Sequence, residues 1–348
     1  MARLLAALRL LWAVTRRDLN SLSSLGLNNL FFCVAFLVQG SHDRETAFLT
    51  ALPFLLVLFL PMLFAISAGT LEKVPSVRAN LWPLSPKERV LLRAAGIALS
   101  PAFWLLGGVI VLWAGVAVGL CFIAFAALVQ LLVFCAARVT GGESPFRLLT
   151  YVPRFPGTLG GVVQVSLRHI LSSLDFYTAV MLSVVGTSYR FCAAKPQVDA
   201  FPILALLIAL TLSTYAQRMF GLESPGSVAR YHLLPVAGWR ILLAKDVAYL
   251  GVLATVALPL GLAPAMTFGL IAIALGRYPS LRQTARQTAW RFTGGDIRFG
   301  ALQIVFGGLV AMGNMRTSHW FFAVAVGTYV LSLIAGDFWW NRSSSYHR

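Results

Sequence analysis

Residues 81–93 read LWPLSPKERVLLR, and residues 233–245 read LLPVAGWRILLAK. Aligned at an offset of 152 residues, the two stretches match Pro83 with Pro235 and Arg93 with Lys245. In each, a proline follows a bulky apolar residue, and a basic helix start then leads into an apolar run. The pair predicts an internal repeat.

The composition around this repeat is that of a membrane protein. Of the 348 residues, 58% are apolar and 11% are charged, against about 25% charged in soluble domains, and the mean hydropathy is +0.79. The net charge is +16, but the basic residues lie between apolar runs and not on one face of a soluble domain, so nucleic acid is not an expected partner. We expect an all-α polytopic integral membrane protein in the lipid bilayer.

Apolar runs of about 20 residues, or somewhat fewer, can cross a hydrocarbon layer of about 30 Å. The sequence predicts about ten transmembrane helices by this criterion. They are expected at 24–39, 47–70, 95–117, 119–137, 176–193, 200–217, twice within 247–276, and at 299–315 and 319–338.

The stretch 247–276 is long for one crossing and short for two. Its middle, Leu258 to Pro264, reads LPLGLAP, and two prolines around a glycine favour a hairpin tip. A hairpin, full or re-entrant, returns the arginines of 277–298 to the cytoplasm. With both termini cytoplasmic, this topology leaves only four of the 28 Lys and Arg residues outside, as the positive-inside rule requires of a plasma (bacterial inner) membrane protein.

Two amphipathic segments complete the repeat. Residues 162–175 place Val163, Leu167 and Leu171 on one helical face, opposite polar residues that include Gln164 and Arg168. The N-terminal 20 residues show a similar pattern. Both segments are expected to lie in the cytoplasmic interface. The repeats are then 1–141, with four spans, and 142–348, with about six.

This pattern resembles the permease subunits of ABC transporters of the type-2 exporter class. That class has an N-terminal elbow helix, two spans, a cytoplasmic loop with a leucine-proline-leucine-serine type motif, and a basic helix that leads into further spans. The resemblance implies that a separate ATP-binding cassette ATPase subunit docks on these loops. The implied docking residues are Pro83, Lys87, Arg89 and Arg93 in the first half and Pro235, Arg240 and Lys245 in the second. A typical domain of the class has six spans, whereas this chain has four plus six.

The chain has no phosphate-binding loop of the form G-x-x-x-x-G-K-[ST], so no cofactor is expected in it, and ATP would act through the partner. Its twelve acidic residues are expected in loops or at span ends, which argues against ion coupling. The four cysteines and five histidines show no metal-ligand spacing. A mainly apolar path favours an amphipathic substrate.

Two other functions are compatible with the sequence. One is a non-transporting membrane scaffold or assembly factor. The other is a membrane-embedded lipid-modifying enzyme, for which Glu72 and Glu223 are the nearest approach to a symmetric acidic pair. The sequence also leaves open a homo-oligomer.

Overall fold

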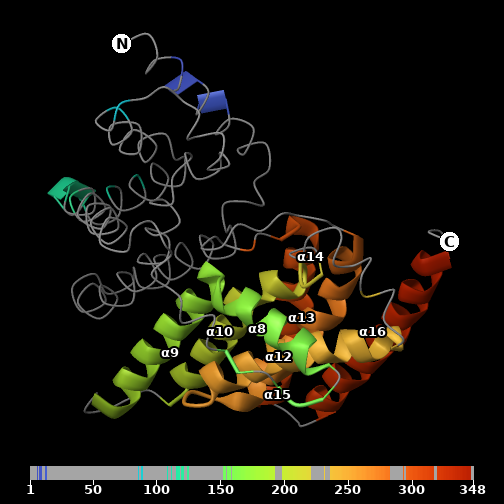
Figure 1. Ribbon diagram of the computed structural model, residues 1–348. Coiled ribbons are helices and arrows are strands. Elements are labelled where there is room, and N and C mark those ends of the chain that lie inside the picture. The colour runs from blue at the N-terminus through green and yellow to red at the C-terminus, as the bar shows by residue number, and fades with distance from the viewer. Residues whose placement is uncertain are drawn as a thin grey trace.

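The computed structural model describes most of the second half of the chain and scattered positions of the first (Figure 1). The described residues are 6, 8, 9, 12, 13, 85, 88, 108, 111, 115–117, 119, 120, 124, 152, 153, 155–157, 159–192, 198–220, 231, 236–282, 293, 295–316 and 320–345. The predicted spans at 24–39 and 47–70 and the repeat boundary at 141 lie outside them. The spans at 95–117 and 119–137 are described at a few positions only.

The described positions of the first half are compatible with the predicted helices. Leu8, Arg9 and Trp12 are helical, in the N-terminal segment where an amphipathic helix is expected. Gly115 has a φ of +90°, in the left-handed region that L side chains rarely adopt. It lies three residues before the predicted boundary between the third and fourth spans and interrupts the helix there.

The second half begins with a bent pair of helices. α8 covers Gly160–Leu171 and α9 covers Leu174–Cys192, and the pair bends by 73° between them. Ser173 lies at the bend, where its Oγ donates to the Ile170 carbonyl at 2.7 Å and accepts from the Phe176 N–H at 3.4 Å. The hydroxyl thus serves backbone groups of both helices where the regular hydrogen bonds are interrupted.

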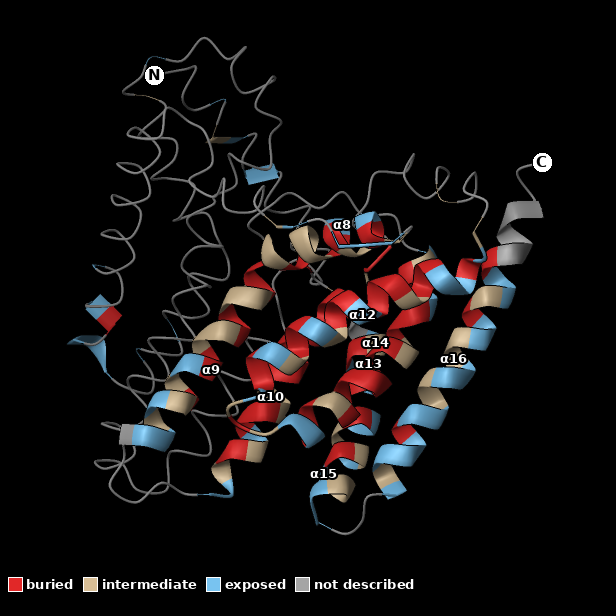
Figure 2. Ribbon diagram, turned by 60° about the horizontal axis from the view of Figure 1, so that its bottom comes forward, coloured by how far each residue is buried: buried red, intermediate tan, exposed pale blue. Residues whose placement is uncertain are grey.

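Three helices form the centre of the described bundle. They are α10 (Ala200–Ala216), α12 (Gly238–Ala257) and α13 (Leu262–Arg282). The break between α12 and α13 falls in LPLGLAP, so the predicted pair of helices is confirmed there. Both helices are longer than predicted, because each continues beyond its apolar run at the end away from the hairpin. Figure 2 shows how strongly these three helices are buried.

The chain ends in two further helical segments. The predicted span at 299–315 is helical throughout as α14 (Ile297–Leu302), the π-helical turn η4 (Gln303–Gly307) and α15 (Gly308–Arg316). Gln303 is fully buried in the π turn, where its amide donates to the Ala272 carbonyl at 2.7 Å and accepts from Gln217 at 2.6 Å. α16 (Trp320–Ser345) follows and presents many apolar side chains at the surface (Figure 2).

Long-range hydrogen bonds show which helix ends meet. At one end of the bundle, three of them join segments that the sequence predicts to be cytoplasmic. They run from the N–H groups of Thr293, Phe220 and Trp239 to the side chains of Asp175, Ser280 and Asp337, at 2.7, 2.9 and 2.8 Å. At the other end, the Arg190 guanidinium donates to the Pro259 carbonyl, and the Asn314 amide donates to the Thr267 hydroxyl at 3.0 Å. These contacts place the helix ends of the described second half at two opposite ends of the bundle.

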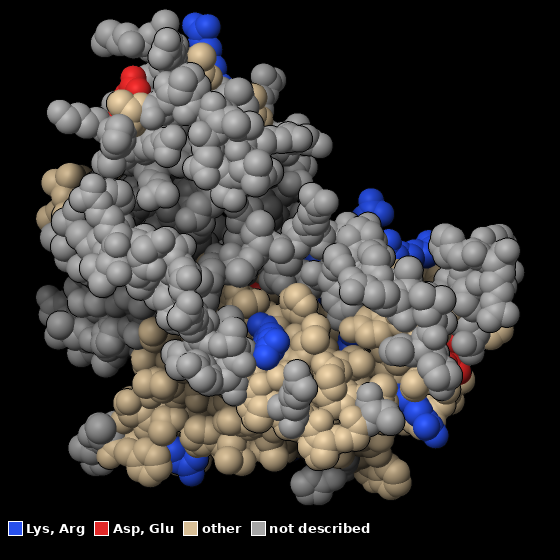
Figure 3. All heavy atoms as spheres, viewed as in Figure 1, with Lys and Arg blue, Asp and Glu red and all other residues tan. Residues whose placement is uncertain are grey.

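The part of the chain that the structure describes is all-helical. Two of its helices are long and apolar enough to cross a membrane, Leu262–Arg282 and Trp320–Trp340, and a third crossing results if the bent pair α8–α9 counts as one. α10 is apolar but shorter, at 17 residues. Figure 3 shows that the described surface on one face is mainly uncharged, with scattered Lys and Arg.

Candidate functional site

The two repeated loops start a helix at equivalent positions. In the first loop, the Ser85 N–H donates to the Glu88 carboxylate at 2.8 Å, and the Glu88 N–H donates to the Ser85 hydroxyl at 3.3 Å. This reciprocal pair is a capping box, which marks Ser85 as the N-cap of a helix. In the second loop, α12 has its N-cap at Ala237, which is Ser85 plus the repeat offset. The two N-cap positions are therefore separated by the 152-residue offset of the predicted repeat.

The second helix start uses a different cap. Ala237 has no side chain that can accept a hydrogen bond, and Arg240 stands where the first loop has Glu88. Instead, the Asp337 carboxylate of α16 accepts from the Trp239 N–H. The close approach of α16 requires glycine at 238, since a Cβ there would lie 2.5 Å from the Trp340 ring. The C-terminal helix thus supplies the cap that the second loop lacks.

Loss of this cap should loosen the first turn of α12. We expect Asp337→Ala to destabilise the protein by about 1 to 2 kcal/mol, the usual cost of removing an N-cap acceptor. Asp337→Asn keeps an oxygen that can accept, and should recover most of the loss. Hydrogen exchange followed by mass spectrometry should show faster exchange at residues 238–242 in the alanine variant, with α10 unchanged. Equal exchange in all three proteins would contradict the capping role.

Only two of the predicted docking residues lie among the described residues. Arg240 is exposed in the first turn of α12, with its guanidinium 5.3 Å from the Trp239 ring. Lys245 is fully buried, where its ammonium donates to the Met219 carbonyl at 3.2 Å and lies 4.0 Å from the Phe220 ring. The remaining predicted residues, Pro83, Lys87, Arg89, Arg93 and Pro235, lie outside the described part.

The prediction that Lys245 belongs to an exposed docking surface is therefore corrected. α12 is already helical from Gly238, so residue 245 lies two turns inside the helix, on a face that packs against the bundle. The sequence pattern indicated where the basic segment starts but not which face its last residue occupies.

A buried ion pair was not expected from the sequence. Asp246 and Arg277 are 1% and 5% exposed, and their side chains meet at 2.7 Å between α12 and α13. The Tyr329 hydroxyl of α16 donates to the same carboxylate oxygen at 2.9 Å, and Arg277 Nε donates to the Ser332 hydroxyl at 3.2 Å. The sequence predicts Asp246 in a loop or at the end of a span, whereas the structure places it inside α12. This network joins three helices and has a structural role.

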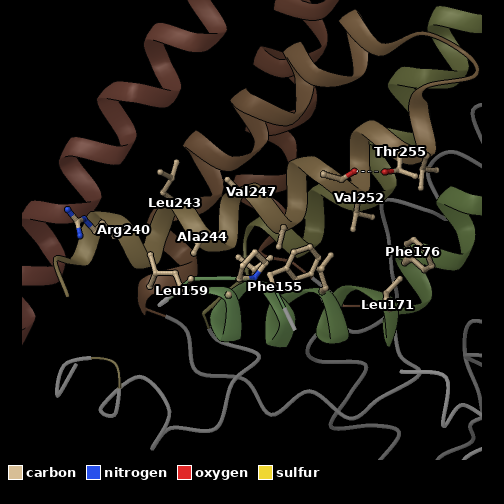
Figure 4. Close-up of a pocket in the computed structure, with 18 of the residues that line it drawn as sticks. Phe155, Leu159, Leu171, Phe176, Arg240, Leu243, Ala244, Val247, Val252 and Thr255 are labelled. Atoms are coloured by element: carbon tan, nitrogen blue, oxygen red, sulfur yellow. Dashed lines mark hydrogen bonds between the residues drawn. The ribbon is translucent and has the colours of Figure 1, made fainter. Parts of the chain in front are cut away.

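A large apolar groove lies between α8, α9 and α12 (Figure 4). Its volume is about 1040 Å³, at the upper end of the range for small-molecule sites. α8 contributes Val163, Leu167 and Leu171, the apolar stripe that the sequence predicts for the membrane interface. The opposite face of α8 is not simply exposed, because the Gln164 side chain is buried and donates to the Val152 carbonyl at 2.6 Å.

One wall of the groove is a continuous stripe of α12. Small and apolar residues line it, and Arg240 lies at its N-terminal end (Figure 4). The stripe consists of Trp239, Arg240, Leu243, Ala244, Val247, Ala248, Gly251, Val252, Thr255 and Val256. Sequence reasoning did not find this groove, although the recurrence of these residues at helical spacing is visible once the start of α12 is known.

The described residues hold no cluster of three or more His, Cys, Asp or Glu side chains that could bind a metal ion. Glu72 and Glu223, the pair considered for an enzyme, lie outside the described part. Comparison with protein-family models, with curated proteins and with solved structures finds no match to this chain.

Proposed function

We propose that this chain is the membrane-spanning permease subunit of an ATP-driven exporter, similar to the type-2 ABC class, and that it spans a plasma membrane about ten times. A separate ATPase subunit supplies the energy, and the substrate is amphipathic. Both termini and the repeated loops face the cytoplasm.

The observation that carries this proposal is the equivalent helix start in both loops. Ser85 and Ala237 are N-caps separated by the repeat offset, and a basic stretch of sequence follows each of them. A tether that merely holds charge at the membrane surface does not require a helix start at one fixed position in both halves. Two matched basic helix starts are suited to hold two copies of one partner.

The arrangement of helix ends supports the proposal further. The starts of α9, α12 and α14 and the ends of α10, α13 and α16 share one end of the bundle. The bend of 73° between α8 and α9 is compatible with an elbow helix that lies along the interface while α9 crosses the bilayer. An ATPase could therefore reach the loops from one side.

The first test is copurification from the native host. The protein, tagged and extracted in mild detergent, should yield an ATP-binding cassette subunit in near-stoichiometric amount by mass spectrometry. Recovery of the chain alone, or with a biosynthetic enzyme only, would contradict the proposal and favour the scaffold or the lipid-modifying enzyme.

Charge reversal in the first loop tests the docking surface directly. Arg89 follows Glu88 directly in the sequence of the first loop. Arg89→Glu should reduce ATPase stimulation by the reconstituted complex about tenfold or more, since like charges at an interface cost several kcal/mol. The matched control is Arg298→Glu, an exposed arginine of α14 outside both loops, which should leave stimulation unchanged. Equal stimulation in the two variants would remove Arg89 from the docking surface.

A further inference from the structure

The described side chains that line the groove between α8, α9 and α12 offer few hydrogen-bonding groups to a ligand. The hydroxyls of Ser183 and Thr255 are used by the protein itself. Ser183 donates to the Val256 carbonyl at 2.6 Å. Thr255 donates to the Gly251 carbonyl at 2.8 Å (Figure 4). A sugar or a peptide would leave its own polar groups without partners in such a groove, at a cost in free energy. The walls therefore favour hydrocarbon.

The groove is longer than the hydrocarbon of one bilayer leaflet, so an acyl chain of that leaflet can lie within it. Its α12 stripe runs from Arg240 to Thr255, which at about 1.5 Å per residue is roughly 22 Å. The hydrocarbon of one leaflet is about 15 Å thick, half of the full layer. Because small residues such as Ala244, Ala248 and Gly251 line this stripe, an extended acyl chain can lie along it.

Among the described residues that line the groove, Arg240 is the only charged one, and it lies at the end next to the loop that precedes α12. Within the described ranges, no carboxylate lies at ion-pair distance from its guanidinium, which contacts the Trp239 ring. At the N-terminus of α12, the Asp337 carboxylate accepts a hydrogen bond from the Trp239 N–H and occupies the place of an anion. The group that can bind an anion is therefore the Arg240 guanidinium. Guanidinium binds phosphate with two parallel hydrogen bonds.

We propose that this groove is a binding site for an acidic phospholipid of the cytoplasmic leaflet. An acyl chain lies along α12 against the apolar stripe of α8, and the phosphate head group binds Arg240 beside the Trp239 ring. The lipid joins α8 to α12 and α9 as a resident component. The choice of the cytoplasmic leaflet rests on the orientation given under the proposed function, but the groove and Arg240 do not depend on transport.

The test uses the full chain reconstituted in vesicles of phosphatidylcholine that contain phosphatidylglycerol, followed by detergent extraction and native mass spectrometry of the retained lipid. Gly251 lines the groove, so the leucine side chain of Gly251→Leu should block it. The variant should still fold, because a Cβ at Gly251 meets nothing within 4 Å. Gly308→Leu is the matched control, since Gly308 is also helical, with equally open space and outside the groove.

The wild-type protein should retain phosphatidylglycerol about tenfold over phosphatidylcholine, in line with the strength of a charge-assisted hydrogen bond. Arg240→Gln should abolish this preference, Arg240→Lys should keep part of it, and Arg298→Gln should keep all of it. Gly251→Leu should lose both lipids, whereas Gly308→Leu should behave as wild type.

Equal retention of the two phospholipids by the wild-type protein would overturn the proposal, and so would equal retention by Gly251→Leu and Gly308→Leu. If the chain retains phosphatidylglycerol but copurifies with no ATPase, the lipid site is supported. Only the proposed exporter function is then contradicted. The two proposals therefore fail separately.

Discussion

Asp246→Asn should lower the free energy of unfolding by about 3 to 5 kcal/mol, the usual cost of removing one partner from a buried ion pair. The substitution leaves the Arg277 guanidinium, 5% exposed, without the carboxylate that it contacts at 2.7 Å. It also removes the charged acceptor of the Tyr329 hydroxyl. Because α12, α13 and α16 all contribute to this network, the loss should be felt across the bundle.

The measurement is unfolding of the detergent-solubilised protein by SDS titration, followed by far-UV circular dichroism. Asp199→Asn is the control, since Asp199 is exposed before α10, and its change should stay within about 0.5 kcal/mol. The double variant Asp246→Leu with Arg277→Met removes both charges and should recover much of the stability. If the double variant loses as much free energy of unfolding as Asp246→Leu and Arg277→Met lose in sum, the two side chains are not coupled.

Gly276→Ala should destabilise the protein by about 2 to 3 kcal/mol through overpacking. α13 passes so close to the end of α10 at this point that a Cβ on Gly276 would lie 2.7 Å from the Ala216 carbonyl carbon and 2.9 Å from the Gln217 nitrogen. These are backbone atoms, so no rotamer change relieves the overlap and the two helices must separate. Larger side chains at 276 should prevent folding.

Gly327→Ala is the matched control for this effect. Gly327 lies inside α16, and a Cβ there meets nothing within 4 Å. The alanine should therefore be neutral or stabilise the helix by up to about 1 kcal/mol, because glycine is a poor helix former. Thermal inactivation in detergent, monitored by size-exclusion chromatography, compares the two variants. Equal stability of Gly276→Ala and Gly327→Ala would contradict the close approach of α10 and α13.

The sequence predicts those features that depend on local patterns. The prolines of LPLGLAP indicate the break between α12 and α13, and the stripe of α8 indicates an amphipathic helix. The repeat predicts where the helix of each loop begins. These signals are local because turns, caps and periodicity involve residues within one or two helical turns.

Features that depend on contacts between distant segments could not be predicted in this way. The sequence places Lys245 and Asp246 at the end of a basic loop. Nothing in the neighbouring residues indicates that Asp246 pairs with Arg277, which lies 31 residues further along the chain. The cap from Asp337 crosses 98 residues. Polar groups that are satisfied by distant partners let a helix extend beyond its apolar run, which explains why α12 and α13 exceed their predicted lengths.

The two helix starts differ in a way that bears on how the chain evolved. Ser85 and Glu88 cap the first helix with neighbouring residues, whereas α12 depends on Asp337 for its cap and on Tyr329 as a partner of Asp246. At the position equivalent to Asp246 the first half has Ala94, which needs no such partner. If the halves arose by duplication, α16 has no counterpart among the four predicted spans of the first half, and α16 and the rest of the second half have become mutually dependent. A chain without α16 would need two changes at once, a new N-cap residue at 237 and an uncharged residue at 246. Because neither change alone is sufficient, loss of α16 in evolution is disfavoured.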